Sequence, residues 1–163
     1  PDSQDICFVP DGDYAAFIRR HTGKEDVPGD FVDETGRVLG RHKGITHYTI
    51  GQRKGLGVSS NEPLYVKAID PERNQVILSG NDALFSRQLT AGAFNWIAWD
   101  VPPRQFRCSA KARYRHPEQP CRVTIREDGT VEVLFDQPQR AITPGQAVVL
   151  YDGDIVLGGG TIL

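Results

Sequence analysis

The sequence of 163 residues predicts a mainly β protein with one short helix. Three observations predict this class. Only residues 11–23 carry helical periodicity, two pairs of strand-like segments flank turn sequences before residue 84, and six more strand-like segments follow residue 85. We therefore expect an N-terminal segment with a helix at 1–26, a small central β domain at 27–84 and a C-terminal six-stranded β-barrel at 85–163.

The helix has recognisable ends. Asp11 or Asp13 can cap its first turn, and Gly23 can terminate it. Its larger apolar residues share one face: Tyr14, Phe17 and Ile18. We expect this face to pack against the rest of the chain.

Two β-hairpins are expected in the central domain. The first joins residues 30–33 to 38–42 through a turn at 34–37, and the second joins 64–70 to 75–78 through a turn at 71–74.

The six remaining strands are expected at residues 89–98, 106–114, 121–126, 130–135, 147–151 and 155–163. Their short, even spacing favours a closed barrel, which removes free sheet edges. Asp152-Gly153-Asp154 is expected to be a hairpin turn and not a carboxylate site. Gly158–Gly160 predicts a bulge or a close backbone contact.

Charge is distributed unevenly along the chain. The net charge of −2 combines −6 over residues 1–34 (9 acids, 3 bases), +9 over 35–126 (6 acids, 15 bases) and −5 over 127–163 (6 acids, 1 base). Arginine, which suits bidentate phosphate contacts, outnumbers lysine 14 to 5. The basic middle predicts a surface that faces a polyanion, although a solvated basic face without a partner fits the same pattern.

The composition also excludes some classes. No apolar run approaches the roughly 20 residues that span a bilayer, so no membrane segment is expected. The three cysteines lack paired spacing, which indicates a reducing cytoplasm. A zinc site from Cys108, His116 and Cys121 would lack a fourth ligand, so we expect no metal.

Strands 106–114 and 121–126 each have an apolar and a basic face. Alternation places Cys108 and Cys121 on the apolar face, as small hydrophobic residues. If the strands pair as a hairpin, the opposite faces form one basic surface from Arg107, Lys111, Arg113, Arg122 and Arg126, with Arg115 and His116 near the turn. Such a surface suits phosphates. Tyr114 is either a core residue or turns outward to stack on a base or ribose.

Residues 48–57 read Y-T-I-G-Q-R-K-G-L-G. Glycines let backbone N–H groups approach an anion, and Arg53 and Lys54 supply charged donors, so the stretch suits phosphate. It matches neither G-x-G-x-x-G nor G-x-x-x-x-G-K-[ST], and a basic surface turn remains the alternative. His42 and His47 lie just before it and are expected to be solvent-exposed turn residues.

Taken together, these segments resemble one family. Residues 48–56 are similar to the Y-T-I-G-Q-R-K-G-L motif of bacterial tRNA-specific 2-thiouridylases (the MnmA type), which sulfurate the wobble uridine of certain tRNAs. Similar segments follow the family's order: S-Q-D-I-C-F at 3–8, K-A-R-Y-R at 111–115, T-P-G-Q at 143–146, Y-D-G-D at 151–154 and L-G-G-G at 157–160. The family's N-terminal PP-loop ATP-binding domain, with its S-G-G-x-D-S motif, has no counterpart in this sequence. The resemblance therefore implies the C-terminal part of a longer enzyme.

The resemblance also implies roles for individual residues. Cys7 matches the cysteine that accepts sulfur as a persulfide from a sulfur-donor protein and delivers it to C2 of the uridine at position 34, after ATP has adenylated the C2 oxygen. The ATP site, with Mg, and the partner cysteine belong to the missing PP-loop domain. Arg113 and Tyr114 match the family's R-Y tRNA contact, and Gln146 matches another. The remaining residues that we expect to contact tRNA are Gly51, Gln52, Arg53, Lys54, Arg107, Lys111 and Arg115. The resemblance further implies a barrel like the second domain of translational GTPases.

Two other functions fit the residues. One is a non-enzymatic β-barrel RNA- or protein-binding module of translation-factor type, in which Cys7 is inert. The acids near Cys7, Asp2, Asp5 and Asp11, would raise a thiol pKa and so favour this reading from the residues alone. The other is a stand-alone cysteine redox protein, which the absence of a C-x-x-C motif disfavours. An S-G-G-x-D-S motif upstream in the parent gene would decide for the enzyme.

Overall fold

The computed structural model describes residues 9, 13–23, 25–114 and 116–163. It confirms the predicted class: a mainly β chain with one short α-helix, a small sheet and a closed six-stranded barrel. The chain divides after Ala83 into two compact units. A separate N-terminal segment at 1–26 stays a prediction.

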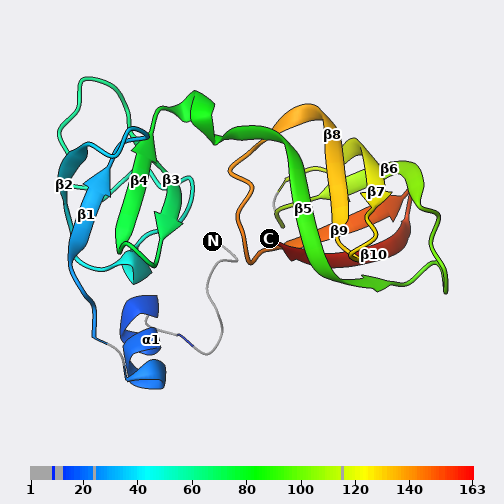
Figure 1. Ribbon diagram of the computed structural model, residues 1–163, viewed down its shortest axis with the longest axis horizontal. Coiled ribbons are helices and arrows are strands. Elements are labelled where there is room, and N and C mark those ends of the chain that lie inside the picture. Colours follow the sequence, from blue (N-terminus) through cyan, green and yellow to red (C-terminus); the bar gives the residue numbers. More distant parts are fainter. Residues whose placement is uncertain (1–8, 10–12, 24, 115) are drawn as a thin grey trace. The chain divides into compact units, whose positions relative to one another are not determined.

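Helix α1 spans Tyr14–Thr22 (Figure 1). Its first turn is capped by Asp13, whose carboxylate accepts a hydrogen bond from the Ala16 N–H (2.9 Å). Gly23 ends the helix in the left-handed conformation (φ 65°), and its N–H donates to the Arg19 carbonyl (2.8 Å). The cap and the terminator are therefore two of the residues that the sequence indicated.

The first unit also holds a four-stranded mixed sheet in the order β2-β1-β4-β3. Its strands are β1 (Gly29–Val32), β2 (Val38–His42), β3 (Tyr65–Asp70) and β4 (Gln75–Ser79). Both predicted hairpins form, as antiparallel pairs β1–β2 and β3–β4. They are joined by parallel pairing of β1 with β4, in which Phe31 lies opposite Val76.

The connection between β2 and β3 covers one face of this sheet. It contains a 3₁₀ helix, η1 (Ile45–His47), and then runs without regular structure to residue 64. Tyr48 and Leu56 from this connection are buried against Phe31 and Val76. The connection therefore contributes side chains to the hydrophobic core.

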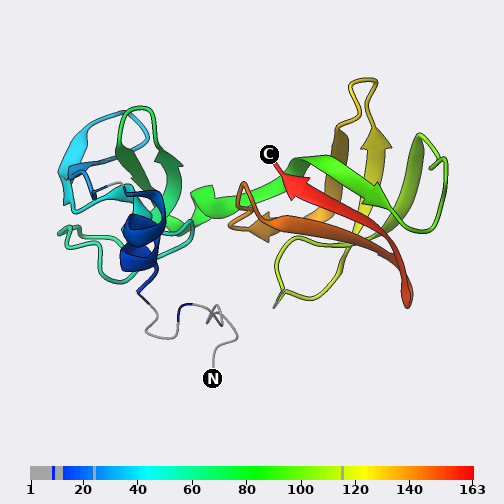
Figure 2. The same ribbon diagram turned by 90° about the horizontal axis from the view of Figure 1, so that it is seen from below.

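The second unit is a closed barrel in the strand order β10-β5-β8-β7-β6-β9 (Figures 1 and 2). A 3₁₀ turn, η2 (Asn81–Leu84), leads into it. The strands are β5 (Phe85–Trp96), β6 (Gln105–Lys111), β7 (Gln119–Ile125), β8 (Val131–Arg140), β9 (Ala147–Asp152) and β10 (Ile155–Ile162). Three strand ends differ from expectation by three residues or more: β5 begins at Phe85 instead of residue 89, β6 stops at Lys111 instead of residue 114, and β8 continues to Arg140 instead of residue 135.

The barrel interior is filled by alternate residues of its strands. Val123, Val131, Val133, Val148 and Leu150 are fully buried there. The predicted Asp152–Asp154 turn joins β9 to β10, with Gly153 at φ 55°.

The glycines of β10 make the predicted close contact. The ladder shifts register around them. A Cβ added at Gly160 would lie 2.5 Å from Phe94 Cδ2 and 2.7 Å from the Gly92 carbonyl oxygen. Only glycine therefore allows β10 to pack this closely.

Candidate nucleic-acid interface

The apolar residues of the 48–57 stretch anchor it to the sheet. The Tyr48 ring makes edge-on contacts with Phe31 (5.1 Å between centroids) and His42 (5.7 Å). Leu56 is buried, and Ile50 packs against the same cluster. The polar residues between them are consequently held on a surface turn.

The glycine-rich turn uses its own polar groups internally. The Gln52 side chain accepts from the Thr49 N–H (3.0 Å) and donates to the Lys54 carbonyl (3.0 Å). The Gly51 N–H donates to the Val66 carbonyl (2.8 Å), at the start of β3. Gln52 and Gly51, both predicted to contact nucleic acid, thus hold the turn in shape. Arg53 and Lys54 are exposed and present their charges outward.

Three backbone N–H groups of this turn are not available to a nucleoside triphosphate. A phosphate cradle needs several free backbone N–H groups that converge on one point. The N–H groups of Thr49, Gly51 and Gln52 already donate within the turn or to β3. We therefore derive no step through ATP from these residues.

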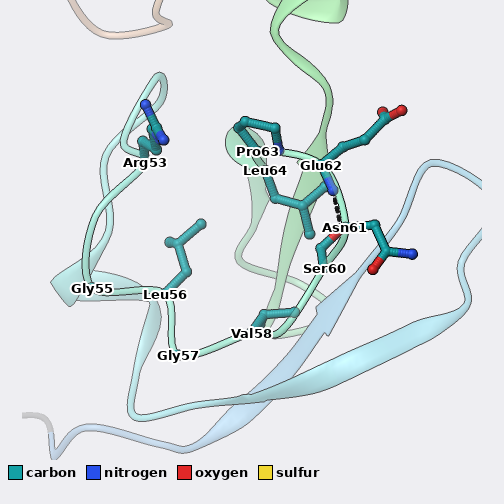
Figure 3. Close-up of a pocket in the computed structure, with 10 residues that line it drawn as sticks. All are labelled: Arg53, Gly55, Leu56, Gly57, Val58, Ser60, Asn61, Glu62, Pro63 and Leu64. Carbon is teal, nitrogen blue, oxygen red and sulfur yellow. Dashed lines mark hydrogen bonds between the residues drawn. The ribbon is translucent and has the colours of Figure 1, made fainter.

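Beside the turn lies an open pocket of about 380 Å³. Figure 3 shows Arg53 on one side of it and the segment Ser60–Glu62 on the other, with Leu56 between them. Val58, Pro63 and Leu64 add apolar lining. The pocket therefore has a mixed lining, with the Arg53 cation and the Glu62 carboxylate beside apolar side chains.

A second group of predicted residues lies at one end of the barrel, beyond β6. Because the strand stops at Lys111, Tyr114 is released from the alternation that would have turned it inward. Its side chain is 81% exposed, and the Lys111 Nζ lies 5.7 Å from the centre of its ring. Of the two placements expected for Tyr114, the structure has the outward one.

Arg113 links two loops at this end of the barrel. Its Nη2 donates to Thr143 Oγ1 (3.3 Å), which lies in the loop between β8 and β9. Gln146 is exposed three residues further along that loop. The structure therefore brings the R-Y and T-P-G-Q segments, about 30 residues apart in sequence, to the same place.

Cationic side chains cluster at this end of the barrel and lower the pKa values of their neighbours. Burial and the neighbouring Arg140 lower the pKa of Arg113, which nevertheless stays protonated at neutral pH. Burial, Arg113 and Arg140 lower the pKa of His116 below its usual 6.5, so its imidazole is neutral at pH 7. Arg140 was missed from the sequence, because the strand that carries it was expected to end at residue 135.

The outward face of the β6–β7 hairpin is less basic than the two strands alone suggested. The predicted pairing forms, and Arg107 lies directly opposite Arg122. However, Arg107 contacts Asp136 (Nη2 to Oδ2, 2.5 Å), and Arg126 forms an ion pair with Glu132. Both acids come from β8, on the far side of β7. The face is therefore mixed in charge, and its cations are partly compensated.

Two predicted residues, Cys7 and Arg115, lie outside the described part of the chain. Cys108 and Cys121 are on the inner face, as expected: Cys121 is fully buried and Cys108 packs against the barrel core. Among the described residues, no group of three or more His, Cys, Asp or Glu side chains could hold a metal ion.

The expectation for His42 and His47 was wrong. His42 is buried: its Nδ1 accepts from the Gly44 N–H (3.1 Å) and its Nε2 lies 3.1 Å from the Asn74 carbonyl oxygen. This pattern fixes a neutral ring with the proton on Nε2. His47 is half-buried and donates from Nε2 to Asp26 (2.9 Å). Both rings therefore stabilise the first unit and are not donors for the glycine-rich turn.

Comparisons with known proteins agree with the barrel architecture of the second unit. Residues 15–80 match the family model described as "tRNA methyl transferase PRC-barrel domain", and residues 86–162 match "Aminomethyltransferase beta-barrel domain". The chain is 57% identical over 162 residues to the tRNA-specific 2-thiouridylase MnmA 1 of Thermoanaerobacter sp. (strain X514). The matched region covers 99% of this chain and 44% of that protein. The chain belongs to the tRNA-specific 2-thiouridylase family.

Other members give the same result. The tRNA-specific 2-thiouridylase MnmA of Acetivibrio thermocellus is 53% identical over 162 residues, 99% of this chain and 45% of that protein. That of Lachnoclostridium phytofermentans is 50% identical over 163 residues, 100% of this chain and 46% of that protein. The chain thus spans less than half the length of the 2-thiouridylases that it matches. Within its described residues, no helix is long and apolar enough to cross a membrane.

Proposed function

We propose that this chain is the tRNA-binding and persulfide-carrying part of an ATP-dependent tRNA 2-thiouridylase that thiolates C2 of the wobble uridine, at position 34. The observation that carries the tRNA-binding role is the meeting of Arg113, Tyr114 and the Gln146 loop at one end of the barrel. An arginine supplies charge to phosphates, and an exposed aromatic ring stacks on a base or ribose. The names of the relatives, all tRNA-specific 2-thiouridylases, support tRNA as the ligand.

In this proposal the two units contribute different contacts. Arg53 and Lys54 contact phosphates from the glycine-rich turn, whose shape Gln52 maintains. At the barrel end, Lys111 and Arg113 contact phosphates while Tyr114 stacks. Arg107 contributes less than expected, because Asp136 already neutralises it.

The persulfide role rests on Cys7 alone among the three cysteines. Its match to the family's S-x-D-x-C-F segment supports it, and the inward placement of Cys108 and Cys121 leaves neither of them suited to meet a tRNA base. In this step the outer sulfur of the Cys7 persulfide forms a bond to C2 of the adenylated uridine as the C2–oxygen bond breaks and AMP leaves. The thiol of a partner cysteine then breaks the S–S bond by forming a disulfide with Cys7. Thiolation by the longer enzyme would also require ATP, a sulfur-donor protein and a PP-loop domain.

Filter binding of tRNA across a salt series tests the binding role. With roughly four to six cations engaged, log K should fall with log salt at a slope of about −3 to −5. Arg113→Ala should reduce this slope by about one unit. The matched control is Arg104→Ala, which removes the same charge at the opposite end of β6, where Arg104 pairs with Glu127 (3.1 Å).

Because Arg113 also bonds to Thr143, its replacement could disturb the loop. Tyr114→Ala avoids this, since that side chain is 81% exposed. It should weaken binding by about 5- to 150-fold, the contribution of one stacked base, without changing the salt slope. Wild-type affinity in both variants would refute the barrel end as the tRNA site.

A further inference from the structure

Cys108 and Cys121 lie directly opposite each other on neighbouring strands. They are Cα partners in the antiparallel β6–β7 ladder, and their Sγ atoms are 3.7 Å apart. Opposed residues in such a ladder have Cα atoms about 4.5 to 5.5 Å apart. Disulfides span Cα separations of about 4.4 to 6.8 Å. The backbone is therefore already placed for a bond, and only the sulfur atoms need to rotate toward each other.

The two thiols differ in access. Cys121 is fully buried, and its Sγ also contacts the Cys108 carbonyl oxygen (3.5 Å). Cys108 is only partly buried, at the edge of the core. A small reagent can consequently reach Cys108 first, and Cys121 is the thiol within reach of it.

Their protonation favours the same order. The hydrogen bond between the two sulfur atoms lowers the pKa of Cys108 and raises that of Cys121. The adjacent Arg107 also favours the Cys108 thiolate, whereas burial and Asp152 oppose it. Cys108 is thus the nucleophile of the pair, and Cys121 is the resolving thiol that closes the disulfide.

We propose that Cys108 and Cys121 form a peroxide-sensitive dithiol that closes to a cross-strand disulfide. The Cys108 thiolate attacks one oxygen of hydrogen peroxide, an S–O bond forms, the O–O bond breaks, and the hydroxide released takes up a proton to leave as water. Cys121 then attacks the Cys108 sulfur. The S–S bond forms, the S–O bond breaks, and a second water leaves with the Cys121 proton. Both sulfurs are oxidised and the peroxide is reduced.

The bond would close a ring around the loop that carries Arg113 and Tyr114. Residues 109–120 lie between the two cysteines, so the disulfide would fix the base of that loop on both strands. The inference stands independently of the proposed thiolation, because it needs only the paired strands.

Peptide mapping of the whole chain tests the inference. The reduced protein is treated with hydrogen peroxide, free thiols are blocked with iodoacetamide, and trypsin is added without reductant. Cleavage at arginine and lysine puts Cys108 in peptide 108–111 and Cys121 in peptide 116–122. We expect these two peptides linked, lighter than their sum by two hydrogen atoms, and separated again by dithiothreitol.

A variant resolves the order of events. In Cys121→Ser the Cys108 sulfenic acid has no partner, so dimedone should label Cys108 strongly there and weakly in the wild type. A control sample oxidised in guanidinium shows which disulfides form when the protein is unfolded. Blocked, unlinked Cys108 and Cys121 in the folded protein would overturn the inference. So would links of Cys108 to Cys7 as the main product, or equal dimedone labelling in variant and wild type.

Discussion

Replacing Asp26 by Asn removes the charge that ties α1 to the following segment of the first unit. The Asp26 carboxylate forms an ion pair with Arg19 of α1 and accepts hydrogen bonds from Thr46 Oγ1 (2.7 Å) and His47 Nε2 (2.9 Å). Its side chain is only 14% exposed. In the Asn variant, Arg19 and His47 keep their places beside a neutral group.

The size of the effect follows from the pKa. Thr46 and His47 hold the Asp26 pKa at about 2 instead of the usual 3.8, with a smaller contribution from Arg19 and against the opposing effect of burial. A difference of this size is worth about 2 kcal/mol of unfolding free energy at neutral pH. Because water still reaches the carboxylate, we expect Asp26→Asn to cost about 1 to 2 kcal/mol.

The pH dependence has a definite sign. A carboxyl with a depressed folded-state pKa contributes its stability above its unfolded-state pKa and loses it as the pH falls through the folded value. The difference between wild type and Asp26→Asn should therefore be constant above about pH 5 and disappear between about pH 4 and pH 2.

Urea unfolding with two probes measures this. Both tryptophans, Trp96 and Trp99, belong to the barrel unit, and α1 is the single α-helix among the described residues. The helical circular dichroism signal should shift in Asp26→Asn while tryptophan fluorescence stays unchanged. The control Asp30→Asn breaks an exposed pair with Arg41 (3.1 Å) and should cost less than about 1 kcal/mol. An equal cost for both variants, or a difference that persists at pH 2, would show that the Asp26 carboxylate does not stabilise the first unit in this way.

Three further predictions concern the barrel, the glycine-rich turn and nucleotide binding. Gly160→Ala should destabilise the barrel by about 1 to 3 kcal/mol, because the added Cβ meets Phe94 and the β5 backbone, whereas Gly80→Ala, which meets nothing, should be nearly neutral in the same urea experiment. A double change of Arg53 and Lys54 to Ala should reduce the tRNA salt slope by about two units, and an unchanged slope would remove the turn from the interface. The purified chain should neither bind ATP at micromolar concentration in calorimetry nor hydrolyse it, and measurable binding would show that a nucleotide site was overlooked.

Much of the fold could be predicted because its signals are local. Turn residues and two-residue alternation located every strand, and Asp13 and Gly23 located the ends of α1. The pairing of β1 with β4 could not be predicted, since parallel pairing joins segments that are distant in sequence and leaves no local pattern.

The candidate site, like the fold, could be predicted from the sequence only in part. The exposed cations Arg53 and Lys54 were predicted from the sequence, but Gln52 looked equally available until its two hydrogen bonds within the turn were seen. The basic hairpin was overestimated because Asp136 and Glu132 reach it from β8, a strand that the hairpin's own sequence does not contain. His42 looked exposed for a related reason: its hydrogen-bond partner Asn74 lies 32 residues away in the sequence.

The proposed thiolation depends on Cys7, and the 2-thiouridine content of tRNA reports on that residue. In the full-length parent enzyme, expressed in cells that lack their own copy, mass spectrometry of tRNA nucleosides reports the level of 2-thiouridine. Cys7→Ser should abolish it, whereas Cys108→Ser, which alters a core-facing thiol, should leave it largely intact. Normal 2-thiouridine with Cys7→Ser would show that Cys7 does not carry the sulfur and would favour a binding module in which Cys7 is inert.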